Sequence, residues 1–543
     1  MDVLQNTRIG KYDIDIEYEG GHLWSILWCF VNAFLIMLIC SRSSFLYVFN
    51  LWDDANSYFT VGKCIFRGFV PYRDLFDQKG ILLYFIYGLS SLISRTTFHG
   101  VFVFEVIAAG MSLIAVFRIY RLFLKTKVFW YILIPVTGAV IYTARNFYWG
   151  GSAEEFLFPF LMWGLYLSVR YFKNVYPEPM ETKDVFIAGI LAGCVFNIKF
   201  NSLGLFFAWM MMVFFAYIIG ARQLARAFAE CVVFLVGMLL TLFPWAIYFG
   251  INGAIDDWMY VYIYKNVFEY SKKLSLSERA AAFYDIIKDH FLNNRIVFIL
   301  IAIGIVYFFV SCISTLVYEY SGSLSRRDRI FLRIKFTELV NLGLLFGFLL
   351  LVIFIGGVSL PYYSFPINGF VVFGFIPFCY IIERNTHFED PERFIIQLSI
   401  VSAIVSMVLC WFLSMNVRVM HLKKDELWLY RFRDYIAESG IKDPGLIVEF
   451  SFDVGLYTVL DIEPICYYFQ TQTLNMDEVL EYQKQYLHSG EADFVVTVNL
   501  EAEGIGDRYD LVMQERCQFY DFDQTYYLYQ RNDNPVEQEE KDN

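Results

Sequence analysis

The chain has 543 residues, of which 57% are apolar, 20% are aromatic and only 18% are charged. Soluble domains carry roughly a quarter charged residues, so this composition indicates a polytopic membrane protein rather than a soluble one. The formal net charge of −12 argues against a nucleic-acid partner, because nucleic-acid recognition requires a basic surface.

The apolar segments define the organisation of the first four-fifths of the chain. Residues 1–22 are polar and lack the pattern of a cleavable signal peptide, so we expect a cytoplasmic tail followed by a retained anchor. About 20 apolar residues span a bilayer. Segments near that length predict about eleven transmembrane helices, at 23–41, 101–120, 128–144, 155–172, 185–198, 202–219, 228–249, 296–317, 337–358, 366–383 and 394–415.

The predicted topology depends on whether the short apolar run 80–94 crosses the membrane. The positive-inside rule, by which short basic loops lie on the cytoplasmic side, distinguishes the two cases. If this run is a re-entrant or surface helix, the basic segments 118–127 and 325–335 fall on the side of the N-terminus. We therefore predict a GT-C-like transmembrane domain over 23–419, with a cytoplasmic N-terminus. The acid-containing loops 42–100 and 250–295 are then external, as is the C-terminus.

The C-terminal part differs in character. Residues 420–531 are charged and alternate helix-like stretches such as DELWLYRFRDYIAES with strand-like stretches such as DFVVTV, which predicts a small external α/β domain. Residues 532–543 are polar and are predicted to be a disordered tail. None of the ten cysteines has CxxC spacing, so the sequence predicts no cysteine metal site, and a divalent metal is left open.

The loop from Leu51 to Tyr84 carries most of the candidate chemistry. Asp53 and Asp54 open an amphipathic stretch that we expect to lie as a helix in the membrane interface. Helix capping is the alternative role for this pair. Lys79 ends the loop, either as an interfacial anchor or as a phosphate ligand. Carboxylates that deprotonate a hydroxyl and cations that stabilise a departing phosphate suit sugar transfer from a lipid phosphate.

Further candidates fall on the same external side in this topology. Glu154 and Glu155 open a predicted span and either cap it or act in the site, with Arg145 upstream as a cation. Lys199 lies between two closely spaced apolar segments, where a charge usually has a partner or a function. Tyr362 and Tyr363, in the turn PYYSFP, suit an interfacial belt or a sugar pocket.

These motifs resemble the GT-C class of integral-membrane glycosyltransferases, and within it the protein O-mannosyltransferase and aminoarabinose (lipid A) transferase group. The resemblance rests on DDANSY, RGFVPYRD and DQKG, on the acids at 154–155, and on NIKFN and PYYSFP. Two features depart from the group: Lys79 precedes glycine rather than proline, and Glu154-Glu155 replaces an Asp-Pro-like motif.

The resemblance implies a polyprenyl-monophosphate-linked sugar donor, an external active site and inversion at the anomeric carbon. Asp53 or Asp54 is then the catalytic base. The substrate-binding residues that we predict around it are Tyr58, Arg73, Asp74, Asp77, Lys79, Arg145, Glu154, Glu155, Lys199, Tyr362 and Tyr363.

We therefore predict a glycosyltransferase of the bacterial inner membrane. Its acceptor is a glycan, a lipid or a protein. We expect membrane lipid to surround the enzyme. The alternative is a non-enzymatic flippase or transporter of lipid-linked saccharide, which would concentrate ionisable residues deep within its spans.

Overall fold

The computed structural model describes residues 22–270, 274–320, 326–386, 392–448, 453–471, 476–499, 508–519 and 522–532. The predicted tails 1–22 and 532–543 therefore lie almost entirely outside the described residues. The chain divides into two compact units. The helical unit comprises Met1–Ser41, Phe104–Trp245 and Lys272–Val417, and the loop unit comprises Arg42–Val103, Ala246–Ser271 and Arg418–Asn543. These units divide the chain differently from the predicted domains, because residues 42–103, which contain the predicted first external loop, group with the C-terminal residues.

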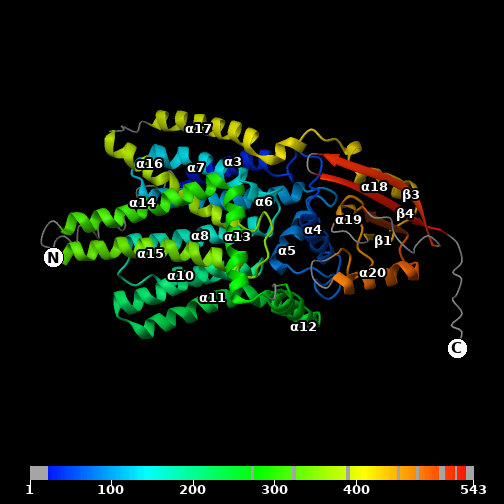
Figure 1. Cartoon of the computed structure of the whole chain (residues 1–543), viewed down its shortest axis with the longest axis horizontal. Coiled ribbons are helices and arrows are strands. Elements are labelled where there is room, and N and C mark those ends of the chain that lie inside the picture. The colour runs from blue at the N-terminus through cyan, green and yellow to red at the C-terminus, as the bar shows by residue number, and fades with distance from the viewer. Residues whose placement is uncertain are drawn as a thin grey trace. The chain divides into compact units, whose positions relative to one another are not determined.

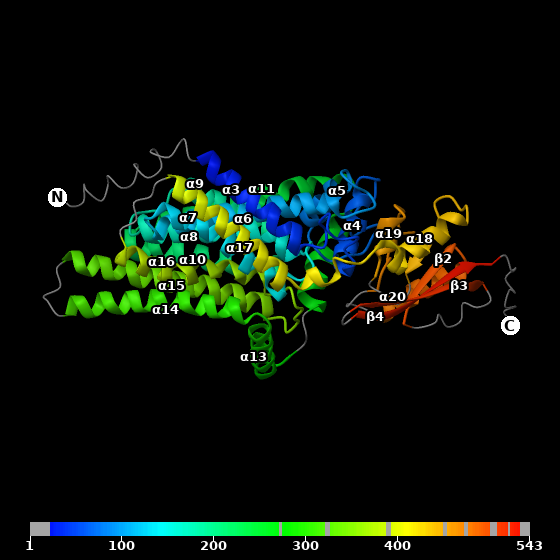
Figure 2. The same cartoon turned by 90° about the horizontal axis from the view of Figure 1, so that it is seen from above.

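Every segment predicted to span the membrane contains helix (Figure 1). The helices that lie wholly or mostly in the helical unit are α3 (His22–Cys40), α6 (His99–Phe123), α7 (Lys127–Thr143), α8 (Ala153–Asn174), α9 (Thr182–Phe196), α10 (Gly204–Phe215), α11 (Leu224–Ile251), α13 (Leu276–Asn293), α14 (Arg295–Tyr320), α15 (Arg326–Phe354), α16 (Val372–Asn385) and α17 (Glu392–Leu413). Helices α14 and α15 run side by side in both views (Figures 1 and 2).

Eight helical segments among the described residues are long and apolar enough to cross a membrane, which confirms a helical polytopic membrane protein. The predicted spans in α7, α8 and α9 do not reach that standard. Helices α7 and α9 have 17 and 15 residues, fewer than the roughly 20 that a span requires. Helix α8 has 22 residues but carries charged side chains at both ends.

Two short helices form the centre of the loop unit. Helix α4 (Asp53–Ile65) crosses α5 (Ile81–Ser91) at Gly62 and Gly88. A Cβ atom at Gly62 would lie 2.5 Å from the carbonyl oxygen of Tyr84, so this contact requires glycine. Helix α5 has 11 residues and is therefore about 16 Å long, roughly half the hydrocarbon core of a bilayer. This length agrees with a helix that does not cross, although its membrane placement stays a prediction.

Helix α4 is not the amphipathic interfacial helix that the sequence predicts. Every residue from Ala55 to Cys64 is buried, including Tyr58 and Lys63. An interfacial helix needs an exposed polar face, but polar side chains on α4 are satisfied within the protein instead. One side of the helix packs on α5, and the other on α19 (Gly455–Val459).

The C-terminal residues form the predicted α/β structure. A four-stranded sheet has the order β1-β2-β4-β3, from Leu446–Val448, Phe494–Val498, Phe522–Arg531 and Tyr509–Phe519. Strand β1 is parallel to β2 and the other pairs are antiparallel. The sequence did not predict β3 or α19.

Helices cover both faces of this sheet because successive side chains on a strand point to opposite sides. Val495 and Tyr529, which are cross-strand partners, pack with Leu487 of α20 (Met476–Ser489). On the other face, Tyr526 stacks on Trp428 of α18 (Trp428–Glu438), with ring centroids 3.8 Å apart. Figure 2 shows α20 beside the strands.

Candidate functional site

The first turn of α4 brings four residues of the predicted loop together. Asp53 and Asp54 both lie in this turn, and neither caps it, because the N-cap position is Trp52. One turn later, the hydroxyl of Tyr58 donates a hydrogen bond to Asp54 Oδ2 at 3.0 Å. The ammonium of Lys79 lies 5.5 Å from the centroid of the Tyr58 ring, within the range of a cation–π contact.

Asp77 belongs to the same group. Its side chain is buried, and its Oδ1 accepts a hydrogen bond from the amide of Gln78 at 2.7 Å. Burial raises the pKa of Asp77 to about 6, against the opposing effect of Lys79, while the charge of Asp54 adds to the rise. Asp54, Tyr58, Asp77 and Lys79 therefore form one cluster, which we call the α4 cluster.

A carboxylate from the C-terminal part lies close to Asp53. Burial raises the pKa of Asp53 well above its usual value, and the charges of Asp453 and Asp54 raise it further. Asp453 is buried, and its Oδ2 accepts a hydrogen bond from the hydroxyl of Tyr526 at 2.8 Å. Burial also raises the pKa of Asp453 to about 6. No local pattern in the sequence points to Asp453, because 400 residues separate it from Asp53.

Arg73 and Asp74 form an ion pair with each other. The hydrogen bonds described here do not connect them to the α4 cluster. Arg73 Nε lies 2.7 Å from Asp74 Oδ1, and Arg73 Nη1 donates to the carbonyl of Asn252 at 2.8 Å. Asp74 Oδ2 accepts a hydrogen bond from the amide of Val70 at 2.7 Å. These contacts stabilise the turn at residues 70–75, and a substrate role for the pair stays a prediction.

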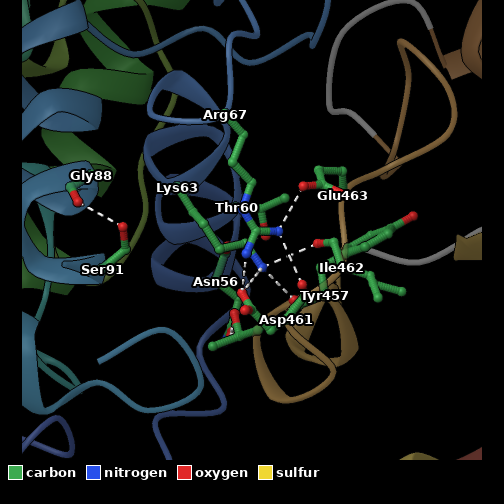
Figure 3. A network of polar contacts seen from close by, with 11 residues as sticks. Asn56, Thr60, Lys63, Arg67, Gly88, Ser91, Tyr457, Asp461, Ile462 and Glu463 are labelled. Carbon is green, nitrogen blue, oxygen red and sulfur yellow. Dashed lines mark hydrogen bonds and ion pairs between the residues drawn. The ribbon is translucent and has the colours of Figure 1, made fainter. Parts of the chain in front are cut away.

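The opposite end of α4 is fixed to the C-terminal residues by two cations (Figure 3). Lys63 donates to the carbonyls of Tyr457 at 2.7 Å and Ile462 at 3.1 Å, and its Nζ lies 3.4 Å from Asp461 Oδ1. Arg67 bridges Asp461 at 2.6 Å and Glu463 at 2.7 Å. The sequence analysis did not single out Lys63, because it is one charged residue in a segment of mixed polar and apolar residues. In the structure its side chain is buried and joins α4 to the C-terminal residues.

Replacing Lys63 by methionine is expected to destabilise the protein by about 1–3 kcal/mol, because two buried carbonyls lose their donor. Thermal unfolding of the purified protein measures this effect. Lys442→Met, at an exposed position shortly before β1, is the control and should leave the melting temperature unchanged. Equal melting temperatures for the Lys63 variant and the wild type would contradict the anchoring role.

In the helical unit, Glu154 and Lys199 form an ion pair. The Lys199 ammonium lies 2.5 Å from Glu154 Oε1, and the side chains are 12% and 2% exposed. The ammonium also lies 3.6 Å from the centroid of the Tyr363 ring and 5.7 Å from that of Tyr362. Four residues predicted from separate segments are thus in contact, which we call the Lys199 cluster.

Glu155 and Arg145 lie apart from the Lys199 cluster in these contacts. Glu155 Oε2 accepts a hydrogen bond from the amide of Gly151 at 2.8 Å, and its own amide donates to Ser152 Oγ. It also interacts with Glu105, which accepts from Ser41 Oγ. The guanidinium of Arg145 is exposed and donates to Asn293 Oδ1 at 3.3 Å, and the cation that pairs with Glu154 is Lys199.

A polar network that is buried except at Ser359 holds the segment that carries the two tyrosines. His290 contacts Ser359 Oγ at 2.8 Å and Ser364 Oγ at 2.9 Å through its two ring nitrogens. Ser364 Oγ in turn accepts from Asn146 Nδ2 at 3.0 Å, and Asn146 and Asn368 exchange amide hydrogen bonds at 2.8 Å. Buried, fully bonded polar networks rigidify their surroundings, so Tyr362 and Tyr363 lie on a well-supported turn.

The fold and these clusters define a polytopic helical membrane protein with a small α/β part at its C-terminus. Its fold is similar to the crystal structure of ArnT from Cupriavidus metallidurans bound to undecaprenyl phosphate, with a TM-score of 0.54 and 10% identity over 94% of this chain and 98% of that one. The apo structure of the same protein matches over the same shares, with a TM-score of 0.51 and 11% identity. This similarity confirms the GT-C-like fold predicted from the sequence.

No protein-family model matches the chain, and the curated protein sequences contain no match. Among the described residues, no three His, Cys, Asp or Glu side chains are grouped so that they could hold a metal ion.

Proposed function

We propose that the protein transfers a sugar from a polyprenyl-monophosphate donor to a hydroxyl of a cell-envelope acceptor, on the external face of a bacterial inner membrane. The grouping of Asp54, Tyr58, Asp77 and Lys79 beside Asp53 is the observation that carries this proposal. It is supported by the similarity in fold to ArnT, which was crystallised with undecaprenyl phosphate. The predicted orientation, with the N-terminus in the cytoplasm, is part of the proposal.

Asp53 is the general base in this scheme. It takes the proton of the acceptor hydroxyl while the acceptor oxygen attacks the anomeric carbon of the donor. The bond from that carbon to the phosphate oxygen breaks, and the polyprenyl phosphate leaves with the bonding electrons. A base works best when its pKa is near the working pH, and burial together with the charges of Asp453 and Asp54 raises the pKa of Asp53 in that direction. Asp54, oriented by Tyr58, positions the acceptor.

Two lysines are suited to the negative charge of the donor phosphate. Lys79 lies in the α4 cluster beside the proposed base. Lys199 is held by Glu154 and Tyr363, so its ammonium is oriented before a ligand arrives. Fixed cations aimed at a developing charge stabilise a transition state without reorganisation. We propose that both lysines contribute to binding of the donor.

The direct test supplies purified protein in lipid nanodiscs with a radiolabelled sugar on polyprenyl monophosphate. Donor consumption and the release of free polyprenyl phosphate in the presence of envelope extract are expected. A flippase would move the labelled donor between the leaflets of proteoliposomes without cleaving it. Movement without cleavage would therefore replace the proposed function by the alternative.

The pH profile of transfer gives a second test. Because Asp53 must be deprotonated to accept a proton, activity should rise with pH through its raised pKa, well above the usual range of an aspartate. Asp453→Asn removes a neighbouring negative charge and should lower the pKa of Asp53. The acidic limb of kcat/KM is then expected to move to lower pH.

Asp477→Asn, at an exposed position of α20, is the matched control and should leave the acidic limb in place. The asparagine at position 453 can still accept the hydrogen bond from Tyr526, so the fold should be retained. An acidic limb that does not move in the Asp453 variant, with normal melting, would contradict the assignment of Asp53 as the base.

A further inference from the structure

The loop unit contains an open cleft of about 480 Å³ that the α4 cluster does not use. One wall comes from residues 67–69 and Asp74, and the other from residues 464–467 and helix α20. The side chains with hydrogen-bonding or ring surfaces in this lining are Arg67, Asp74, Tyr467, Tyr482 and Tyr486. Small-molecule sites have volumes of about 300–1,000 Å³, so the cleft is of the size of a ligand site.

Three tyrosines contribute aromatic rings and hydroxyl groups to the lining of the cleft. Tyr482 and Tyr486 are one turn apart on α20, with ring centroids 5.2 Å apart and an angle of 41° between the rings. Both are half-buried, because they also pack against the core cluster around Leu487 and Val495. Tyr467 is half-buried as well, and its amide donates to the hydroxyl of Tyr482 at 3.4 Å.

Charged groups stand on the facing wall. Arg67 is held by Asp461 and Glu463, and Asp74 is held by Arg73 and the amide of Val70. Each is only partly exposed, so its orientation is fixed before a ligand enters. A cleft that combines ring faces with oriented polar groups suits a molecule that has both apolar C–H faces and hydroxyl edges. A sugar ring has both, whereas an acyl chain offers no hydroxyl.

The cleft is joined to the loop that carries the α4 cluster. The hydroxyl of Tyr467 donates to the carbonyl of Tyr72 at 3.0 Å, and the amide of Phe76 donates to the carbonyl of Tyr467 at 3.0 Å. The hydroxyl of Tyr72 donates to the carbonyl of Lys79 at 2.6 Å. Tyr467 is therefore hydrogen-bonded directly to Phe76, which precedes Asp77, and through Tyr72 to Lys79, which follows it.

We propose that this cleft binds carbohydrate of the acceptor, so that the acceptor is a glycan or a glycan-bearing lipid rather than a protein. The inference rests on the proposed function, because it names the class of acceptor for that reaction. Tyr482 and Tyr486 stack on sugar rings, and Arg67 and Asp74 bond to the hydroxyl groups. Bound there, the acceptor lies against the loop that presents Asp77 and Lys79.

The test measures binding of water-soluble oligosaccharides to the full chain in nanodiscs without donor. Maltohexaose, chitohexaose and the deacylated core oligosaccharide of lipopolysaccharide are the probes, and ligand-detected NMR is the readout. Tyr486→Leu keeps an apolar cover on the core but loses the flat ring, and should weaken binding about fivefold or more, as expected for a lost stacking contact. Tyr486→Phe keeps the ring and should retain most of the affinity.

Tyr527→Leu is the matched control, because Tyr527 is half-buried on the same core cluster but is not part of the cleft lining. It should bind the probes as the wild type does. A purely structural role for Tyr486 predicts equal effects of the two leucine variants on melting temperature and none on binding.

Three results would overturn the inference. All three oligosaccharides could fail to bind the wild type, a Ser/Thr-rich peptide could bind in their place, or the Tyr486→Leu variant could bind with the affinity of the wild type. Since no donor is present, these outcomes are independent of catalysis. A protein that binds the oligosaccharides but never cleaves the donor would refute the proposed function and leave the carbohydrate site standing.

Discussion

Asp53→Asn is expected to slow sugar transfer by at least about a hundredfold, because a positioned general base contributes roughly 10²–10⁴ in rate. The asparagine has the same shape and leaves the first turn of α4 in place, but its amide cannot accept the proton. Binding of polyprenyl phosphate should be unchanged, since Asp53 acts on the acceptor. Initial rates with radiolabelled donor, measured beside donor affinity, separate the two effects.

The chain contains a matched control for this substitution. Asp256 and Asp257 form a second Asp-Asp pair in the first turn of a helix of the loop unit, α12 (Ile255–Trp258). Asp256→Asn removes an equivalent charge near a helix N-terminus and should leave transfer unaffected. Wild-type turnover in both Asp53→Asn and Asp54→Asn, with donor binding intact, would show that the loop is not catalytic.

Lys199→Met should abolish measurable donor affinity and also destabilise the protein. The stability effect arises because Glu154, which is 2% exposed, would be left buried without its cation. Breaking a buried ion pair by removing one partner costs about 3–5 kcal/mol. Binding of polyprenyl phosphate and thermal unfolding are measured on the same preparations.

A double variant separates structure from function in the Lys199 cluster. Lys199→Met with Glu154→Gln leaves no buried charge, so most of the lost stability should return while donor affinity stays lost. The control is Asp184→Asn, which breaks the ion pair with Arg170 near the opposite end of α8. It should reduce stability and leave donor affinity unchanged. Normal donor affinity in the double variant would remove Lys199 from the donor site.

Some features of the fold could be predicted because the signal is local. Continuous apolar runs predicted helices at every expected span, and the alternation in DFVVTV predicted β2. Charged residues make a run a weaker candidate for a membrane span. Helix α8 is an example, with Glu154 and Glu155 in its first turn and Lys173 in its last. Strand β3, YDLVMQERCQF, was missed because its mixed polar sequence depends on pairing with β4 rather than on its own periodicity.

Whether a candidate residue could be predicted depends on how far apart in the sequence it and its partner lie. Asp54 and Tyr58 could be placed together from helical spacing, since residues four apart share a face. Tyr363 and Lys199 could be placed on one side only through the predicted topology. Asp453 and Lys63 were missed, because their roles come from contacts across about 400 residues that no local pattern records.

The anchoring of α4 has a consequence for how the chain could be shortened. Asp53 lies at the start of this helix and Lys63 ten residues later, about 15 Å along the helix axis. The end of α4 at Lys63 is held by contacts with Tyr457, Asp461 and Ile462. A truncated protein that stops after α17 would therefore lose the contacts that hold the helix carrying Asp53, the proposed base. The loop at residues 42–100 would still be present, but it could not replace those contacts.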